Sequence, residues 1–323
     1  MSLIHRQPVS LSTRARDFLA IEGLSAGQLV ELLDAAERML PVVVGGKATG
    51  DQSFSQALRG RVVANIFFED STRTRVSFEI AAKRLGAEVV NIGATGSSAS
   101  KGESLVDTAR NIEAMGVDVI VLRTAISGGA AMVAQRVRCP VINAGDGRHE
   151  HPTQGLLDAL TLRLRLGDLA QKRVAIVGDI SNSRVARSTT HALVALGARV
   201  VAVGPPALIP VGFDQLAGNG NITITHDIDA IIGEIDAIMM LRVQLERAAG
   251  AAIASDYRAA FGLTSARRAR LRAGVPILHP GPINRGIEID DAVADDLEDS
   301  MIMTQVSCGV AARMAVLLRA IAT

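Results

Sequence analysis

The feature that most constrains this chain is a regular alternation of short, β-branched apolar runs with longer segments of helical period. The run at 62–68, for example, precedes an amphipathic stretch at 74–85, and the same order then repeats. Strands that alternate with helices in this way form parallel sheets with helices on both faces. The strands expected from this pattern are Val62–Phe68, Ala87–Ile92, Asp118–Leu122, Pro140–Asn143, Arg173–Val177, Arg199–Val203, Asn221–Thr225, Ala237–Met240 and Pro276–Leu278.

Helices are expected between these strands and at both ends of the pattern. Ser25 and Gln28 have the spacing of a capping box, and apolar residues follow with helical period up to Leu40. Pro41 and Gly45-Gly46 are expected to end this first helix. The other helices expected are Thr74–Leu85, Glu103–Met115, Gly128–Arg136, Pro152–Leu166, Arg184–Leu196 and Met301–Ile321.

The pattern begins again near residues 148–155, which indicates two domains. The chain has 323 residues, and domains of about 150 residues are common. We therefore expect an α/β protein with two doubly wound domains, each a parallel sheet flanked by helices. The aliphatic composition of the expected strands suits sheets that are buried on both faces.

The charge balance excludes one class of partner. Lys and Arg number 34 against 33 Asp and Glu, so the net charge is +1 and no overall basic field is available for nucleic-acid phosphates. With 7 Phe, 1 Tyr and no Trp, a platform that stacks bases is not expected either. The sequence predicts no nucleic-acid partner.

No segment has the pattern of a membrane span or an export signal. The charge-free stretch 200–213 is too short and contains three prolines, and the first residues lack an apolar h-region. The two cysteines, Cys139 and Cys308, are far apart and suit small core residues in a reducing compartment better than a disulfide framework. We expect a cytoplasmic protein with no membrane partner.

A strand, a cluster of hydroxyl groups and an arginine meet at residues 67–75. Backbone N–H groups at the start of a helix favour an anion, and Ser71, Thr72 and Thr74 would add donors. Arg73 can bind phosphate oxygens through two parallel hydrogen bonds. The alternative is ordinary N-capping by the hydroxyl groups, with the arginine on the surface. The glycine-rich P-loop pattern is absent.

The segment His149-Glu150-His151-Pro152-Thr153-Gln154 carries a second group of polar side chains. Pro152 suits the first position of a helix, so His151 and Gln154 can face one cleft. Capping of the helix by these two residues is the alternative. His149 and His151 lack the cysteine or carboxylate cluster of a metal site, so no metal is expected.

The loop 93–102 consists of small polar residues with one cation, Lys101. Such a composition is typical of an exposed loop, and spacing alone favours a solvated lysine.

Three segments of the second half follow expected strands. Gly178 ends a strand as in dinucleotide-binding folds, but the rest of the G-x-G-x-x-G fingerprint is missing, which argues against an NAD dehydrogenase. Arg184 lies where the carboxyl end of that strand meets a helix, the usual ligand crevice of such sheets. Arg242 and Gln244 follow a later strand, with a salt-bridged surface arginine as the alternative. The prolines and glycines of 279–286 fix an irregular backbone whose carbonyls can point at a ligand, or simply a rigid turn.

Together and in this order, these motifs resemble the aspartate/ornithine carbamoyltransferase family. Phe67–Thr74 matches the family's carbamoyl-phosphate signature FxE-x-STRT in full, and His-Pro-Thr-Gln at 151–154 matches a second motif. The family's order of motifs spans about residues 60–286, and the final helix fits as well. The resemblance implies a carbamoyl-phosphate-binding domain at 1–152, an aspartate-binding domain at 153–300, and a C-terminal helix, 301–323, that returns to the first domain.

The resemblance implies transfer of the carbamoyl group of carbamoyl phosphate to L-aspartate, giving N-carbamoyl-L-aspartate and phosphate, in pyrimidine biosynthesis. Arg242-Val243-Gln244 is similar to the site for the aspartate side chain. The Asp, the Ser-Met-Gly stretch and the Cys of the ornithine branch are absent, and that branch is the nearest enzyme alternative. No cofactor is needed, because the leaving group is already phosphate. One departure is Gly281, where some members carry a larger apolar residue.

The family's site residues carry over position by position. Thr74, Arg123 and His151 are implied to donate to the carbonyl oxygen, while Arg73 and Lys101 also take part in catalysis. Gln154 and the backbone near Pro280 are implied to orient the carbamoyl nitrogen. The full set implied for carbamoyl phosphate is Ser71, Thr72, Arg73, Thr74, Ser97, Arg123, His151, Gln154, Gly281 and Pro282. The set implied for aspartate is Lys101, Arg184, Arg242 and Gln244.

The resemblance also implies a homotrimer with shared active sites, in which Ser97 and Lys101 reach a neighbouring subunit. Some relatives also bind a regulatory chain or a dihydroorotase, and residues 1–20 are a candidate contact for such a partner. A scaffold subunit without catalysis is the alternative from another class. Such a subunit would have lost charged ligands, and this chain keeps Arg73, Lys101, Arg123, Arg184 and Arg242.

Overall fold

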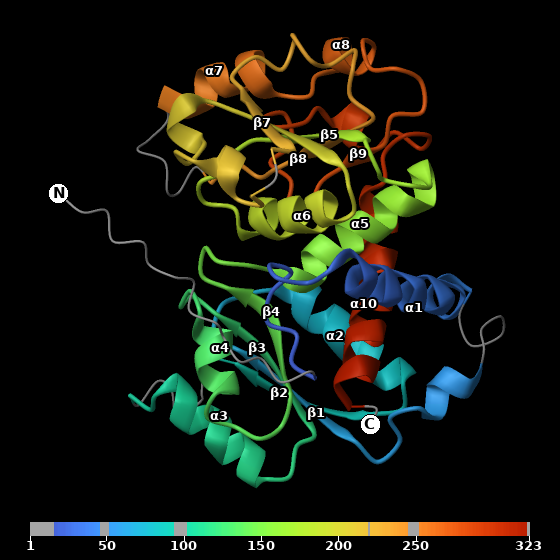
Figure 1. The fold of residues 1–323 in the computed structure, drawn as a ribbon, viewed down its shortest axis with the longest axis vertical. Helices are drawn as coiled ribbons and strands as arrows, with labels where there is room; N and C mark the ends of the chain where they lie inside the picture. Colours follow the sequence, from blue (N-terminus) through green and yellow to red (C-terminus); the bar gives the residue numbers. More distant parts are fainter. Residues whose placement is uncertain (1–15, 46–51, 94–101, 219, 245–251, 322–323) are drawn as a thin grey trace.

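Two parallel sheets form the framework of the molecule and lie one above the other along its longest axis (Figure 1). The computed structural model describes residues 16–45, 52–93, 102–218, 220–244 and 252–321. The strand order is β2-β1-β3-β4 in the first sheet and β7-β6-β5-β8-β9 in the second. Every pair of neighbouring strands in these sheets is parallel, which confirms the expected fold class.

All the expected strands are present, with ends that differ by a few residues at most. The first sheet contains β1 (Val62–Phe67), β2 (Glu88–Gly93), β3 (Val119–Thr124) and β4 (Val141–Asp146). The second contains β5 (Arg173–Val177), β6 (Arg199–Val203), β7 (Ile222–Thr225), β8 (Ala237–Met240) and β9 (Ile277–Leu278).

Each sheet has apolar clusters on both faces, so both are buried between layers of helices. One face of the first sheet packs on α3 (Leu105–Ala114) and α4 (Gly129–Ala134). The cluster on its other face includes α1 (Ala26–Val44), α2 (Thr72–Arg84), α5 (Pro152–Leu166) and α10 (Ile302–Ile321). The second sheet is covered by α6 (Arg184–Ala195) on one face and by α7 (Ala252–Phe261) and α9 (Asp291–Ala294) on the other; α8 (Ser265–Arg268) lies beside α9.

The first helix begins as expected and ends at one of the two expected points. Ser25 and Gln28 form the capping box, with both reciprocal hydrogen bonds present. The prediction is wrong for Pro41, because α1 continues to Val44 with Pro41 inside it, but Gly45 is the C-cap residue as expected. Its last turn is held by other contacts: Gly45 N–H donates to the Pro41 carbonyl, and the Arg84 guanidinium donates to the Val42 carbonyl. These contacts offset the hydrogen bond that a proline cannot donate.

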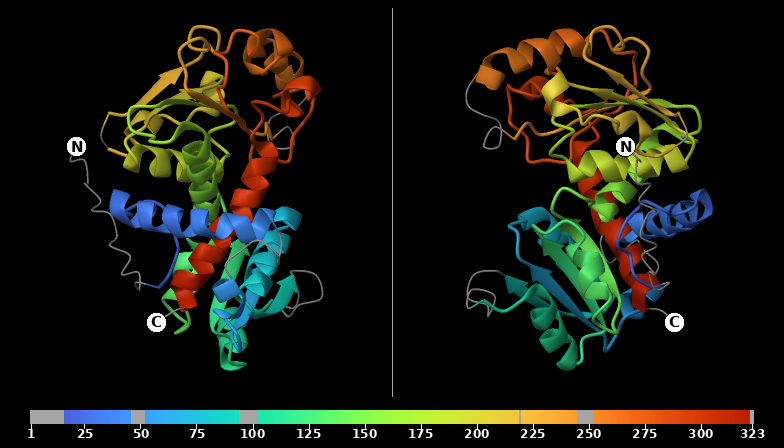
Figure 2. Two further views of the ribbon diagram at one scale, coloured as in Figure 1. Left: turned by 90° about the vertical axis from the view of Figure 1, so that its right-hand side faces the viewer. Right: turned by 60° about the vertical axis from the view of Figure 1, so that its left-hand side comes forward.

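The last helix, α10, returns to the first sheet and passes α1, α5 and α2 (Figure 2). By length and apolar composition alone it could cross a membrane, as one such helix among the described residues. Its buried side chains instead belong to the apolar cluster of the first sheet, which accounts for its composition. Cys308 on this helix is buried and Cys139 is half-buried, and neither forms a disulfide in the described part of the chain.

Candidate active site

The site lies at the carboxyl ends of the strands, where α2 begins directly after β1. Ser71 is the N-cap residue of α2, yet its side chain makes no capping hydrogen bond. The alternative of ordinary capping is therefore not found, and the hydroxyl group is available to a ligand. Thr74, in the first turn, is 7% exposed and points into the interior toward α5.

Thr74 meets the start of α5 at His151. Thr74 Oγ1 lies 3.4 Å from His151 Nε2, and the His151 backbone N–H donates to Ser188 Oγ at 2.8 Å. His151 is the N-cap residue of α5 but makes no side-chain cap bond, and its buried Nδ1 has no partner within the described chain. The two motifs at 67–75 and 149–154 are thus brought to one point.

His151 is held in its neutral form. Burial lowers its pKa well below the usual value, and the positive charges of Arg123, Arg313 and Arg184 lower it further. A neutral imidazole donates one hydrogen bond and carries no charge of its own. His151 can therefore act as a hydrogen-bond donor to an oxygen that gains negative charge.

Glu69 joins two of the predicted site arginines in an ion-pair cluster. Arg123 Nη2 donates to Glu69 Oε1 at 3.1 Å, and Arg184 donates to both carboxylate oxygens at 2.5 and 2.9 Å. Burial acts to raise the pKa of Glu69, but the hydrogen bonds and charges of the two arginines outweigh it and lower the pKa. Burial and the charge of Arg184 lower the pKa of Arg123 to about 10. An incoming anion must compete with Glu69 for Arg184.

Arg73 lies against Gly281 in the segment 279–286. The family resemblance places both residues in the site for carbamoyl phosphate, and such a shared site requires them to be close. A Cβ atom at Gly281 would lie only 2.8 Å from Arg73 Nη1, and the φ of Gly281 is +62°. This close approach explains why the position has no side chain here. Gly145 has a similar role, because a Cβ there would lie 3.0 Å from Arg184 Nε and 3.2 Å from Arg123 Nη1.

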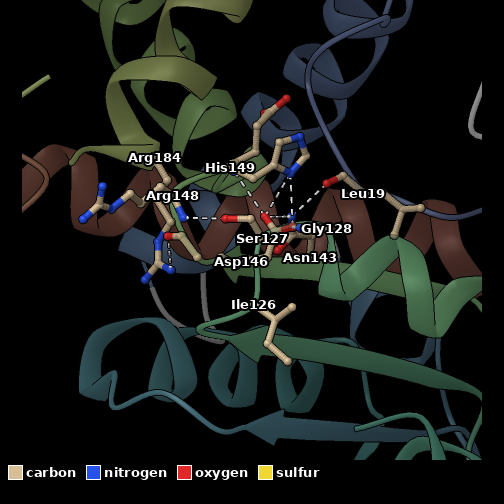
Figure 3. Close-up of polar contacts among 12 residues, drawn as sticks. Leu19, Ile126, Ser127, Gly128, Asn143, Asp146, Arg148, His149 and Arg184 are labelled. Carbon is tan, nitrogen blue, oxygen red and sulfur yellow. Dashed lines mark hydrogen bonds and ion pairs between the residues drawn. The ribbon is translucent and has the colours of Figure 1, made fainter. Parts of the chain in front are cut away.

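Asp146 fixes the turn between β4 and α5 that presents His151 (Figure 3). Its carboxylate accepts hydrogen bonds from Asn143 Nδ2 at 2.8 Å, from Gly128 N–H at 2.7 Å and from Glu150 N–H at 3.1 Å. His149 Nδ1 lies 3.1 Å from the same carboxylate, whose hydrogen bond raises the His149 pKa. His149 therefore serves the turn, not the ligand.

The segment after β8 lies beside the loop after β5. Gln244 Nε2 donates to the Asn182 carbonyl at 3.3 Å, and Asn284 Nδ2 donates to the Val243 carbonyl at 3.0 Å. Because β5 and β8 are neighbours, Arg184 and Arg242 follow adjacent strands at the same edge of the second sheet. Ser97 and Lys101 lie outside the described residues.

A hollow of about 410 Å³ opens beside the ion-pair cluster, lined by Glu69, Ala125, Ser127, Gly147 and Arg148. A larger depression of about 990 Å³ lies at the opposite edge of the first sheet, before β3 and β4, and shares no residue with the site. Elsewhere, Glu22, Glu150 and His191 lie close together. The carboxylate of Glu150 already accepts hydrogen bonds from two backbone N–H groups and Ser188, so this group is explained without a metal.

Several residues of the site were not expected from the sequence. Glu69 stood inside a recognised motif without an assigned role, although a carboxylate beside arginines is a simple signal. Asp158 follows Gln154 by four residues on one helix, a spacing that places both on one face. Arg313 is a single buried charge within the apolar run of α10, 5.3 Å from the centre of the Phe78 ring, and burial lowers its pKa to about 9.

Comparison with known proteins gives one consistent family. Residues 16–164 match the model described as aspartate/ornithine carbamoyltransferase, carbamoyl-P binding domain, and residues 170–320 match the corresponding Asp/Orn binding domain. Aspartate carbamoyltransferase catalytic subunits of Myxococcus xanthus and Rhodospirillum rubrum are 54% and 51% identical over 94% of this chain, covering 98% and 92% of those proteins. The aspartate transcarbamoylase of Trypanosoma cruzi in complex with carbamoyl aspartate and phosphate superimposes with a TM-score of 0.85 at 30% identity, covering 97% of this chain and 98% of that one.

Proposed function

The chain belongs to the aspartate/ornithine carbamoyltransferase family, and we propose that it carbamoylates the amine of L-aspartate with carbamoyl phosphate as donor. The amine attacks the carbonyl carbon, a C–N bond forms, and the bond from carbon to the phosphate oxygen breaks. The amine loses a proton, and the products are N-carbamoyl-L-aspartate and phosphate.

The observation that carries this proposal is the meeting of Thr74 and His151 at 3.4 Å. It brings the start of α2, with Ser71 and Arg73, to the start of α5, with Gln154. The hydroxyl groups and Arg73 then bind the phosphate, while Thr74, His151 and Arg123 donate to the carbonyl oxygen as its negative charge grows. Correct positioning of two reactants contributes roughly 7–11 kcal/mol, and one oxyanion donor about 3–4 kcal/mol.

Two cations beside the second sheet favour a dicarboxylate as acceptor. Arg184 and Arg242, which follow the adjacent strands β5 and β8, can pair one carboxylate each, with Gln244 as a further donor. A second amine, as in ornithine, would meet like charge there. The test is turnover of carbamoyl phosphate with either aspartate or ornithine, and robust turnover of ornithine alone would contradict the assignment.

Arg242→Ala probes the same choice within the site. It leaves one carboxylate of the acceptor without its partner, and the loss of a buried charged hydrogen bond costs about 2–5 kcal/mol. We expect kcat/KM for aspartate to fall by more than thirtyfold, with little change in the KM for carbamoyl phosphate. Steady-state kinetics with each substrate varied in turn measures both, and an unchanged kcat/KM for aspartate would remove Arg242 from the site.

We further propose that the chain works in the cytoplasm, in pyrimidine biosynthesis, as a homotrimer with shared active sites. The sequence of the 93–102 loop supports the shared site, since Ser97 and Lys101 match residues that reach a neighbouring subunit in the family. A regulatory chain or a dihydroorotase is the proposed further partner, with residues 1–20 as its contact. Light scattering of the whole chain and of a form without residues 1–20, each with and without a candidate partner, tests this; identical assemblies would contradict it.

A further inference from the structure

We infer that Asp158 is the positioning residue that fixes the direction of two amide side chains, Gln154 and Gln305, and thereby shapes both sides of the pocket for the carbamoyl nitrogen. This inference rests on the proposed function, because it assigns the carbamoyl NH2 group to that pocket. Asp158 itself touches no substrate.

Asp158 is completely buried at the centre of a cluster drawn from three helices. Its Oδ1 accepts hydrogen bonds from Gln154 Nε2, one turn earlier on α5, at 2.9 Å and from Gln305 Nε2 of α10 at 2.8 Å. Its Oδ2 accepts from Thr189 Oγ1 of α6 at 2.7 Å. All the interactions seen for this carboxylate are therefore with donors.

An ionised carboxylate can only accept hydrogen bonds, so both amides must turn their NH2 groups toward it. An asparagine at this position would permit a second arrangement, in which its NH2 faces the amide oxygens and both glutamines are reversed. The two arrangements fill the same space. The acceptor-only carboxylate excludes the reversed one at both glutamines, and at Gln305 the His279 backbone N–H, which donates to Oε1, also opposes it. Burial raises the pKa of Asp158 to about 6, so the group is still ionised at neutral pH.

The first consequence concerns Gln154. With its Nε2 on Asp158, its Oε1 is the end left for a ligand, and among the described residues no donor bonds to that oxygen. An amide oxygen accepts from the NH2 of a carbamoyl group, whereas the reversed amide would present a donor to a donor.

The second consequence reaches the opposite wall through Gln305. Its Oε1 accepts the His279 backbone N–H at 2.8 Å, and His279 Nδ1 in turn accepts the Gly281 N–H at 2.8 Å. The proton of the neutral imidazole then belongs on Nε2, which lies 3.2 Å from Glu288 Oε1. Gly281 lies against Arg73, the arginine proposed to bind the phosphate. One chain of hydrogen bonds therefore runs from Gln154 through Asp158, Gln305 and His279 to Gly281.

The experiment separates positioning of the NH2 group from general damage by comparing two ligands. Carbamoyl phosphate has the NH2 group, and acetyl phosphate has a methyl group in its place. In Asp158→Asn we expect kcat/KM for carbamoyl phosphate to fall about tenfold, the effect of one misdirected hydrogen bond. The inhibition constant of acetyl phosphate, measured in competition with carbamoyl phosphate, should stay within about twofold, because a methyl group needs no acceptor.

A second variant and a control complete the test. Gln305→Met cuts the branch to His279 and leaves Gln154 on Asp158, so it should give a smaller loss that is again confined to carbamoyl phosphate. Thr161→Val is the control, because Thr161 is equally buried on α5 but its hydroxyl bonds to the Leu157 carbonyl at 2.8 Å and to the Cys308 side chain, not to Asp158 or either glutamine. In this variant, neither kcat/KM for carbamoyl phosphate nor the inhibition constant of acetyl phosphate should change relative to the other.

Two results would overturn the inference. One is wild-type kcat/KM for carbamoyl phosphate in Asp158→Asn; the other is a parallel loss for both ligands in the folded variants, which indicates a structural role alone. If Asp158→Asn does not fold, the ratio in Gln305→Met decides. Failure of the wild-type protein to carbamoylate aspartate would instead contradict the proposed function, so the two failures are distinguishable.

Discussion

Arginines give the site a positive field; Arg123 and Arg313 are buried, whereas Arg73 is exposed. Partial burial lowers the pKa of Arg73, and deeper burial lowers the pKa values of Arg123 and Arg313, because these cations have lost water that their neighbours do not fully replace. The carboxylate of Glu69 partly offsets the charges of Arg123 and Arg184. A phosphate dianion and a dicarboxylate would supply the remaining negative charge. Binding of both substrates would therefore offset the desolvation free energy of arginines that lack enough carboxylate partners in the folded protein.

A substitution at Gly281 tests how the position of the Arg73 guanidinium affects binding of the phosphate. In Gly281→Ala the new methyl group would stand 2.8 Å from Arg73 Nη1, so the guanidinium must move away from the phosphate position. We expect the KM for carbamoyl phosphate to rise about tenfold or more, the effect of a weakened charged hydrogen bond. The melting temperature should fall by a few degrees, because an alanine at the Gly281 φ of +62° costs about 1–2 kcal/mol, while the displaced group is the far end of a flexible side chain. A large loss of stability with an unchanged KM would contradict the contact.

His151 makes stability depend on pH in a definite direction. Below about pH 6.5 the unfolded chain binds a proton at this residue, whereas the folded chain, whose His151 pKa is far lower, does not. Stability from this source is therefore complete above pH 6.5 and is lost as the pH falls. Urea unfolding of wild type and His151→Gln at pH 7 and pH 5 should show a smaller loss for the variant, by up to about 1.4 kcal/mol per pH unit. Parallel losses would show that His151 does not titrate as described.

The elements divide into those that the sequence predicts and those that it does not. The strands and most helices follow from hydrophobic period, because each is buried on a face that the period defines. The continuation of α1 past Pro41 depends on Arg84, a contact from a distant element, and local pattern does not contain it. The short helices α8 and α9 were not predicted, since four residues are too few to show a period. Helix α7, with ten residues, was not predicted either.

The site divides in the same way. Ser71, Arg73, His151 and Gln154 could be predicted because their motifs are continuous in the chain. Two pairs could not be predicted, because each joins segments far apart in sequence: Glu69 with Arg184, and Asp158 with Gln305. Their chemistry is visible only when the fold brings the segments together.

The capping box of α1 predicts a stability effect at the level of one helix. Ser25→Ala removes the hydroxyl group that accepts from the Gln28 N–H and leaves that donor without its partner. We expect the free energy of unfolding to fall by about 1 kcal/mol, with unchanged kcat because α1 contributes no residue to the site. Gly27→Ala, in the first turn beside it, is a suitable comparison and should be neutral or stabilising. Chemical denaturation of the three proteins measures both changes.

At the scale of the whole molecule, the candidate site lies where the segment after β1 of the first sheet meets the start of α6 beside the second sheet. Arg73, Arg123 and His151 come from the first sheet and its helices, whereas Arg184 comes from the first turn of α6 on the second. Glu69 already joins the two parts through Arg184. A change in the distance between the sheets would therefore change the site directly.

The proposed shared site predicts complementation between two inactive proteins. Arg73→Ala and Lys101→Ala homotrimers should each be nearly inactive, because every site lacks one group. Mixed trimers made by dissociation and reassembly should regain activity, since an intact Arg73 then meets an intact Lys101 of the next chain. A hybrid with two chains of one kind should hold one wild-type site in three. Activity that stays at the parental level after proven subunit exchange would place Lys101 within its own chain or outside the site.

The return of α10 to the first sheet has a consequence for the order of synthesis. The apolar cluster on that sheet joins residues such as Phe18 and Leu160 to Cys308 and Ile321. A ribosome that adds about 5–20 residues per second therefore needs roughly 8–31 s between the end of α5 and the end of α10. During this interval the apolar cluster on that face is covered only by α1, α2 and α5 and lacks the side chains of α10, while the second sheet is still being made. The nascent chain is thus a natural client for chaperones that hold exposed apolar surface, and ribosomes stalled before α10 should release aggregation-prone fragments.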